Sequence, residues 1–146
     1  MHVHALLVVT LLLSATTADK KTVAVLPFGS PTRWSEMGRN AQPTFITELV
    51  KSKQVRVVDE KHADSAVSRF AKEGNGLYDA NKVRQIGRFL KADYVLSGQV
   101  SNTGDAFTMT VHVTNVETLE LEMAEDVDFR DVGKMRIGAE MIAHHD

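Results

Sequence analysis

Imidazole side chains are the first candidates for chemistry in this sequence, because histidine binds metal ions and transfers protons near neutral pH. The chain has six of them: His2, His4, His62, His112, His144 and His145. No two stand at the helical spacing that a metal site needs. The C-terminal pair, followed by Asp146, is typical of a frayed polar tail. We therefore predict no metal and no cofactor.

Motifs for nucleophilic attack and phosphate binding are missing as well. The sequence has no Gly-x-Ser-x-Gly segment, no glycine-rich loop ending in Gly-Lys-Ser or Gly-Lys-Thr, and no cysteine. The lack of cysteine excludes disulfides, thiolate metal sites and a cysteine nucleophile. Gly74 and Gly76 are interpreted as a helix stop and Gly98 as a close packing point. We predict that the chain is not an enzyme.

A group of acidic residues lies near the C-terminus, and Arg130 is the only basic residue among them. Its members are Glu117, Glu120, Glu122, Glu125, Asp126, Asp128 and Asp131. Paired carboxylates perform acid–base catalysis only in a pocket that shifts the pKa of one of them. Four members instead alternate along a predicted strand and share one face: Glu120, Glu122, Asp126 and Asp128. That face is either solvated charge that protects a sheet edge or a docking surface for a basic partner.

A second candidate surface is uncharged. Polar side chains alternate with apolar ones along two predicted strands: Ser97, Gln99, Thr108, Thr110, His112 and Thr114. They form the solvent side of a sheet, or they receive a partner or an added strand. The candidate partner-binding residues of both surfaces are Thr108, Thr110, His112, Glu120, Glu122, Asp126 and Asp128. Trp34 is interpreted as the first residue of a core-facing helix stripe, with an exposed binding anchor as the alternative.

The elements that must position these residues follow from the spacing of apolar side chains. Residues 22–28 are apolar on both alternating faces and predict a strand covered on both sides. The next helix begins near Ser35 with a kink at Pro43, or near Gln42 with Pro43 in its first turn. A short strand at 55–58 follows.

Two more helices are expected, the first capped by Asp59 and the second following Asp79. From residue 93 onward the hydrophobic pattern has a period of two, which is typical of strands. A hairpin turns at 102–105, a last strand spans 121–129, and a helix spans 131–143. The order is β-α-β-α-α-β-β-β-α. We predict an α/β (α+β) fold with a mixed five-stranded sheet packed by helices.

Composition places this fold in one secreted domain. The 146-residue chain has 17 basic and 19 acidic residues and a net charge of −2, which favours neither nucleic acid nor an anionic membrane surface. We predict that residues 1–18 are a signal peptide and that residues 19–146 form the domain. An uncleaved N-terminal anchor is the alternative. Without cysteine we expect no lipid anchor, and we expect no stable membrane insertion of the mature domain.

Four segments in order carry a resemblance to known proteins: Val23–Phe28, Glu48–Asp59, Ile86–Gly98 and Val111–Thr118. This succession resembles the bacterial envelope superfamily of the curli secretion channel (CsgG-like), the penicillin-binding-protein activator (LpoB-like), a flagellar outer-membrane protein and the N-terminal domain of TolB. The resemblance covers about residues 22–130. It implies the fold given above and an envelope role through protein contacts, without chemistry.

The chain departs from that superfamily in three respects. Members of the channel and activator branches usually carry a lipidated cysteine, which is missing here. The channel branch inserts extra amphipathic hairpins, for which the segments between strands are too short. The turn before the last strand usually carries a Thr-Gly pair, whereas this chain has Thr118 and Leu119.

Three functional hypotheses follow. The first is a periplasmic accessory or assembly protein that docks on an envelope system for secretion, cell-wall synthesis, or flagellar or curli assembly. The second is a self-assembling ring component of an outer-membrane secretion apparatus. The third, an enzyme or small-ligand binder, has the least support, because no polar side chains converge in the sequence pattern.

Overall fold

The computed structural model describes residues 20–30, 35–71, 78–103 and 106–129. Its elements are β1 (Thr22–Val25), α2 (Ser35–Ser52), β2 (Arg56–Val57), α3 (Glu60–Phe70), α4 (Ala80–Phe89), β3 (Tyr94–Thr103), β4 (Ala106–Asn115) and β5 (Leu121–Phe129). The predicted element order is confirmed through β5. The predicted last helix, 131–143, and Trp34 lie outside the described residues.

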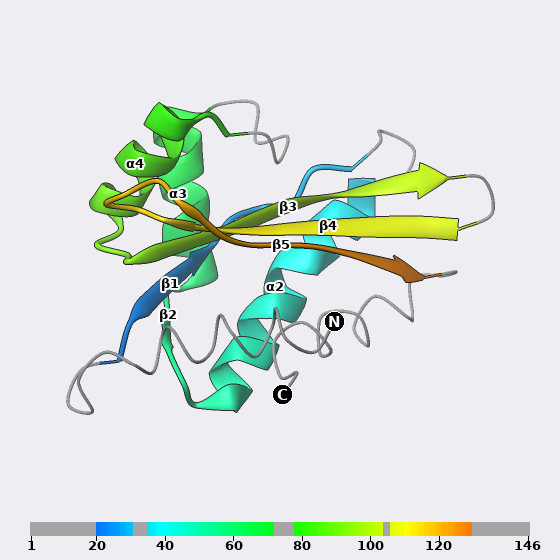
Figure 1. Ribbon diagram of the computed structural model, residues 1–146, viewed down its shortest axis with the longest axis horizontal. Helices are drawn as coiled ribbons and strands as arrows, with labels where there is room; N and C mark the ends of the chain where they lie inside the picture. Colours follow the sequence, from blue (N-terminus) through cyan, green and yellow to red (C-terminus); the bar gives the residue numbers. More distant parts are fainter. Residues whose placement is uncertain (1–19, 31–34, 72–77, 104–105, 130–146) are drawn as a thin grey trace.

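The five strands form one mixed sheet in the order β2-β1-β3-β4-β5, which confirms the predicted fold class (Figure 1). Strand β1 runs parallel to β2 and β3. Strands β3, β4 and β5 are antiparallel neighbours. Parallel neighbours need long crossover connections: α2 links β1 to β2, while α3 and α4 link β2 to β3.

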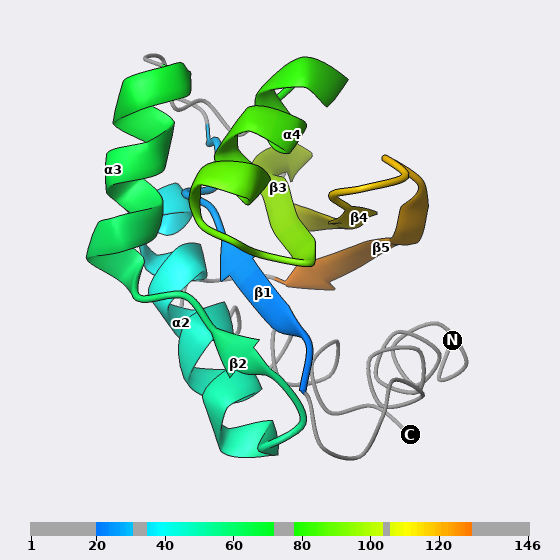
Figure 2. The ribbon, with the colours of Figure 1, turned by 90° about the vertical axis from the view of Figure 1, so that its left-hand side faces the viewer.

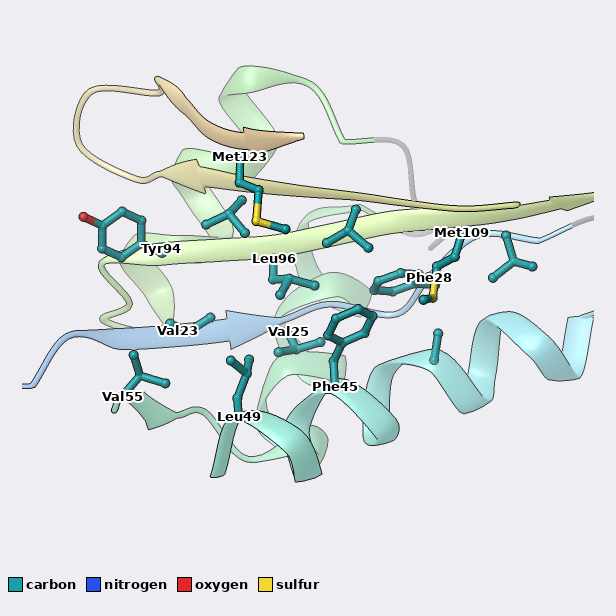
Figure 3. Close-up of a cluster of buried hydrophobic side chains, with 14 of the residues drawn as sticks. Val23, Val25, Phe28, Phe45, Leu49, Val55, Tyr94, Leu96, Met109 and Met123 are labelled. Atoms are coloured by element: carbon teal, nitrogen blue, oxygen red, sulfur yellow. The ribbon is translucent and has the colours of Figure 1, made fainter. Parts of the chain in front are cut away.

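The helices pack on opposite faces of the sheet (Figure 2). Helix α2 contributes Ala41, Phe45 and Leu49 to one buried cluster, the α2-side core (Figure 3). Helices α3 and α4 form a second cluster on the other face, the α3/α4-side core, with Ala24 of β1 and Val95 of β3 among its members. Strands β1 and β3 therefore lie between two cores, as the apolar character of residues 22–28 predicts.

The helix starts follow the polar residues that precede them. Asp59 accepts a hydrogen bond from the Lys61 backbone N–H, and Asp79 accepts one from Lys82. Such caps satisfy donors that the first helical turn leaves unpaired, so both predicted starts are confirmed. Helix α2 begins at Ser35 and contains Pro43, which selects the earlier of the two predicted starts.

Strand β1 is shorter than predicted because of Pro27, which has no N–H to donate. Regular pairing ends at Val25, and the Leu26 N–H still donates to the Leu96 carbonyl. Bonding to β3 resumes at Gly29, whose N–H donates to the Gly98 carbonyl and whose carbonyl accepts from the Val100 N–H. The segment after β1 therefore stays tied to β3.

Gly98 makes room for an aromatic side chain from this segment. A Cβ atom at Gly98 would lie 2.8 Å from the Phe28 ring, and that ring stacks on Phe45 of α2 with centroids 5.5 Å apart. The predicted close packing point at Gly98 is confirmed. The absence of a side chain on the central strand lets Phe28 bridge β3 and α2.

The turn between β4 and β5 docks on helix α4. A Cβ atom at Gly87 of α4 would lie 2.4 Å from Cγ2 of Val116, so the valine packs directly on the helix backbone. Beside it, Arg84 donates to the Glu117 carbonyl at 3.0 Å. Arg88 lies 3.7 Å from the Glu117 carboxylate.

The Gly87 contact gives the first prediction. Alanine in place of glycine in a helix interior usually adds about 1 kcal/mol of stability, but at Gly87 we expect Gly87→Ala to lower the free energy of unfolding by about 1–3 kcal/mol through overpacking. Urea titration measures this change. In a Val116→Ala background the cost should fall, and Gln85→Ala on the exposed side of α4 is the control. An equal cost in both backgrounds would contradict the contact.

The same turn holds a leucine in a backbone conformation that favours glycine. Leu119, which stands where superfamily members usually have glycine, has φ of 61° and donates its N–H to the Asn115 carbonyl. Its side chain packs against the α3/α4-side core. This burial offsets the strain of a left-handed residue, which is about 1–2 kcal/mol.

Two substitutions separate strain from packing at this position. Leu119→Gly and Leu119→Ala both lose the packed side chain, but only alanine keeps the left-handed strain. We expect the glycine variant to have the higher free energy of unfolding, by about 1 kcal/mol. At exposed Ser68 in α3 the same pair should show the opposite order. An alanine variant at least as stable as the glycine variant at both positions would rule out strain at Leu119.

Candidate partner-binding surface

Burial changes along strand β3 and leaves one end of the sheet open. Tyr94, Val95 and Leu96 are buried, Gln99 is half-buried, and Ser101 is exposed. Helices α3 and α4 gather over the end where β3 begins, and β3, β4 and β5 extend beyond them (Figure 1). On the α3/α4 side, therefore, the far end of the three antiparallel strands is not covered by these two helices.

The strand register assembles polar side chains on this open end. We call it the polar sheet face, and it comprises Gln99, Ser101, Thr108, Thr110, His112, Ala124 and Asp126. Across the three strands, Thr110 pairs with Gln99 and Asp126, and His112 pairs with Ser97 and Ala124. Paired residues share a face. The predicted hydroxyl surface and one predicted carboxylate therefore form one continuous surface.

One predicted member of this region is not solvated. Ser97 is only 8% exposed. It lies two residues after Val95, which belongs to the α3/α4-side core. Asp128 pairs with Thr108 in the backbone register, which places it in line with Asp126. The partner-binding role of these residues stays a prediction.

A β-bulge overturns the predicted single row of acidic residues. Met123 pairs with Val113, but Leu121 pairs with Thr114, so Glu122 is the extra residue in β5. One extra residue reverses which side chains share a face. Leu121 is 54% exposed, whereas Met123 is 5% exposed in the α2-side core. Leu121 and Met123, two residues apart in the sequence, therefore do not share a face.

The four predicted carboxylates consequently occupy different places. Asp126 lies on the polar sheet face, and Asp128 follows it in register. Glu120 lies before β5, in the turn, where its N–H donates to the Thr118 hydroxyl. Glu122 lies near Tyr94, whose ring closes one end of the α2-side core with its hydroxyl directed away from the other labelled side chains (Figure 3).

The charge of Glu122 affects the pKa of Tyr94. Burial raises the pKa of the Tyr94 hydroxyl above its ordinary value of 10.0, and the Glu122 and Asp93 carboxylates raise it further. A hydrogen bond with Asn115 acts in the opposite direction. The folded state thus favours the neutral hydroxyl, and the resulting stability is present below pH 10.0 and is lost as the pH rises through the folded-state pKa.

A second surface, which the sequence patterns did not reveal, lies on α3 and α4. Phe89 is 39% exposed, and its ring lies 5.8 Å from His62 and 5.7 Å from Phe70 between centroids. The Arg69 guanidinium lies over both phenylalanine rings, 5.3 Å from that of Phe89. The sequence does place Phe70 and Phe89 at the C-terminal ends of two helices. Whether the two rings come into contact depends on how α3 packs on α4, which the sequence pattern does not give.

Among the described residues, no three His, Asp or Glu side chains are grouped to hold a metal ion. A depression of about 190 Å³ on α2 is lined by Pro43, Thr44, Thr47 and Glu48, which is below the usual size of a ligand pocket. In the part of the chain that the structure describes, no helix has the length and apolar character to cross a bilayer.

Comparison with known proteins assigns the family. A family model described as the peptidoglycan-synthase activator LpoB matches residues 39–128, more than half of the chain. The chain belongs to the LpoB family. This match includes most of α2, all elements from β2 to β4 and most of β5, and therefore the whole polar sheet face of this LpoB-family chain. A search of curated protein sequences found no match.

Solved structures share the fold of this LpoB-family chain at low sequence identity. The LpoB C-terminal domain from Escherichia coli is 20% identical, with a TM-score of 0.63 over 85% of this chain and 93% of that one. A longer E. coli LpoB structure, also 20% identical with a TM-score of 0.63, covers 86% of this chain, but only 64% of its own length is matched. A PelC dodecamer from Paraburkholderia phytofirmans is 16% identical, with a TM-score of 0.54 over 84% of this chain and 85% of that one.

The position of Glu122 can be tested through Tyr94. The chain has two tyrosines, so a Tyr78→Phe background leaves Tyr94 as the only one. We expect Glu122→Gln to lower the pKa of Tyr94, because it removes a neighbouring negative charge. Tyrosinate absorbance measures that pKa, while circular dichroism checks the fold. Glu120→Gln should leave it unchanged; equal shifts in both variants would place the two carboxylates together.

Proposed function

We propose that the chain is an accessory protein of the bacterial envelope that activates a peptidoglycan synthase through protein contacts. The family match over residues 39–128 carries this proposal, because that family is described as a peptidoglycan-synthase activator. The chemistry is then performed by the synthase, and this chain contributes binding energy. Binding that favours the active state of an enzyme raises its activity without any catalytic group in the activator.

The polar sheet face is the proposed docking surface. It presents hydroxyl and imidazole groups on a sheet whose other face is packed against α2. A rigid strand surface holds such groups in fixed positions, so little ordering is needed when a partner binds. The carboxylate of Asp126 at its border favours a basic neighbour and adds to partner choice.

The proposal also includes where the protein works. Residues 1–18 direct secretion, and residues 19–146 form the periplasmic domain. In this proposal the chain is held at the envelope by its protein partner.

Reconstitution tests this function directly. The chain is secreted, purified and added to a purified peptidoglycan synthase of the same bacterium, and the rate of glycan polymerisation is followed. We expect the rate to rise and saturate with chain concentration. A rate that does not depend on the chain would overturn the proposal. Sedimentation of the chain alone addresses the alternative of a self-assembling ring, since a ring sediments as one large species.

The docking surface is tested by paired charge substitutions. Thr108→Arg with Thr110→Arg should raise the concentration needed for half-maximal activation by at least about tenfold, which corresponds to about 1.4 kcal/mol, because two large cations occupy the polar sheet face. Ser65→Arg with Ser68→Arg makes the same change in charge on the exposed surface of α3. Thermal unfolding confirms that both pairs fold. If only the α3 pair lost activation, the docking surface would lie on the helices.

A further inference from the structure

We propose that a cluster of arginine and aromatic side chains on the surface of α3 and α4 binds an acidic helical segment of a partner protein. The cluster comprises His62, Arg69 and Phe70 of α3 and Phe89 of α4, and we call it the arginine–aromatic cluster. This inference goes beyond the proposed function, because it gives the chain a second binding surface apart from the polar sheet face.

Phe89 is a large apolar side chain that the fold leaves partly in solvent. It is 39% exposed, whereas Val83 and Ile86 of the same helix are buried in the α3/α4-side core. Its ring packs across the surface of α3 against His62 and Phe70. Among the described elements, α3 and α4 are the outermost on their face of the sheet (Figure 2). Removal of such apolar surface from water favours association with a partner.

Arg69 adds a positive charge that is held in a fixed position beside this ring. Its guanidinium carbon lies 5.6 Å from the centroid of the Phe70 ring and 5.3 Å from that of Phe89. In the part of the chain that the structure describes, no carboxylate or carbonyl group accepts a hydrogen bond from it. The planar guanidinium has five donors that match a carboxylate in bidentate fashion, and packing on aromatic rings leaves them accessible. The arginine–aromatic cluster therefore presents an oriented site for a carboxylate.

The helix on one side of the cluster is basic. No Asp or Glu occurs from Ala80 to Ala92, whereas four basic residues do: Lys82, Arg84, Arg88 and Lys91. Glu117 offsets one of these charges through its contact with Arg88, and the others remain. A surface of one charge sign favours a partner of the opposite sign, so the fitting partner is acidic.

The acidic residues of α3 lie on the side of that helix away from the cluster. Asp64 accepts a hydrogen bond from the buried Gln42 side chain and so faces α2. Glu60, four residues earlier, lies on the same side of α3. His62 and Arg69 are seven residues apart and contact Phe89 of α4. Helix α3 therefore does not itself neutralise the arginine–aromatic cluster.

The spacing within the cluster indicates the form of the bound segment. The Arg69 guanidinium carbon and the centroid of the Phe89 ring are 5.3 Å apart. Side chains four residues apart on a helix are separated by about 5–6 Å, whereas neighbours on one face of a strand are separated by about 7 Å. One face of a helix can thus place a carboxylate on Arg69 and a large apolar side chain on Phe89. The expected segment is an amphipathic helix with Leu and Glu at this spacing.

The composition of the cluster favours a protein over other anionic partners. Arginine and aromatic side chains are enriched among the residues that contribute most to protein–protein binding. A saccharide stacks on an open aromatic face, but Arg69 already lies over the Phe89 ring. An anionic membrane needs a broad basic surface, whereas this chain has a net charge of −2.

A second copy of this chain does not supply the expected segment from its described helices. Two large apolar side chains are exposed on these helices, Val50 of α2 and Phe89 of α4. Neither has an acidic residue three or four positions away within its own helix. The occupant is therefore a different protein.

A designed peptide tests the cluster without a synthase. The probe is a capped, alanine-rich peptide of about 15 residues with two Leu–Glu pairs, each four residues apart, added to the ¹⁵N-labelled full chain. We expect the amide signals of α3 and α4 to shift on binding, and those of Thr108, Thr110 and His112 on the polar sheet face to stay unchanged. A peptide with Lys in place of Glu and a peptide with Ala in place of Leu are expected not to bind.

Single substitutions with matched controls locate the binding. Arg69→Gln and Phe89→Ala should each raise the Kd of the probe at least about tenfold. Arg39→Gln and Val50→Ala remove the same charge and an exposed apolar side chain from α2, and should leave the Kd unchanged. Arg69→Lys keeps the charge but loses the planar fork, so its Kd should lie between those of the parent chain and Arg69→Gln. Urea titration confirms that each variant folds.

Several outcomes overturn the proposal. They are no binding of the probe, equal binding of the Lys peptide, and equal losses in the α2 controls and the cluster variants. Binding of phosphatidylglycerol vesicles or of glycan fragments through Arg69, without binding of the probe, would also overturn it. Phe89→Ala should leave synthase activation unchanged, and a loss of activation would contradict a second surface. Failure of the probe to bind would leave the activation experiment standing.

Discussion

The rest of the structure depends on a change of burial along strand β3. Its first half is buried on both faces of the sheet, and its second half is buried on one face only. Tyr94, Val95 and Leu96 are apolar on both faces and need cover above and below. Parallel β1 supplies one edge, and helices from both crossovers supply the faces. Beyond Gly98 the sequence becomes polar on one face, so only the α2 side is buried. The fold is thereby held at one end of the sheet and presents its polar surface at the other.

Periodicity predicted most of this arrangement because each element is long or bounded by a strong local signal. Asp59 and Asp79 mark helix starts, and strict alternation in β4 predicts its two faces. The start of α2 could not be predicted, because the preference of Pro43 for a first turn competes with the apolar stripe on both sides of it. The longer helix forms, because its interior residues Ala41 and Phe45 are buried against the sheet.

The acidic surface could be predicted only in part, for a different physical reason. A period of two assigns faces correctly only while each residue faces one partner. The extra residue at Glu122 breaks that condition, and no single side chain in β5 signals it. Bulges are set by how a whole strand fits its neighbour and the turn before it. Here that turn is determined by Val116, which packs on the backbone of α4 at Gly87, and by Leu119 in its left-handed conformation.

The bulge also determines where the carboxylates of β5 lie. It separates Glu122, whose charge acts on Tyr94 at the border of the core, from Asp126, whose charge borders an open surface. The polar sheet face therefore carries fewer carboxylates than the alternation in the sequence predicts. The LpoB domain and the PelC dodecamer share this scaffold at 20% and 16% identity. Because each shares the fold with this chain at such low identity, the strand order by itself specifies no partner, and the partner proposed for this chain depends on local details of bulge and turn.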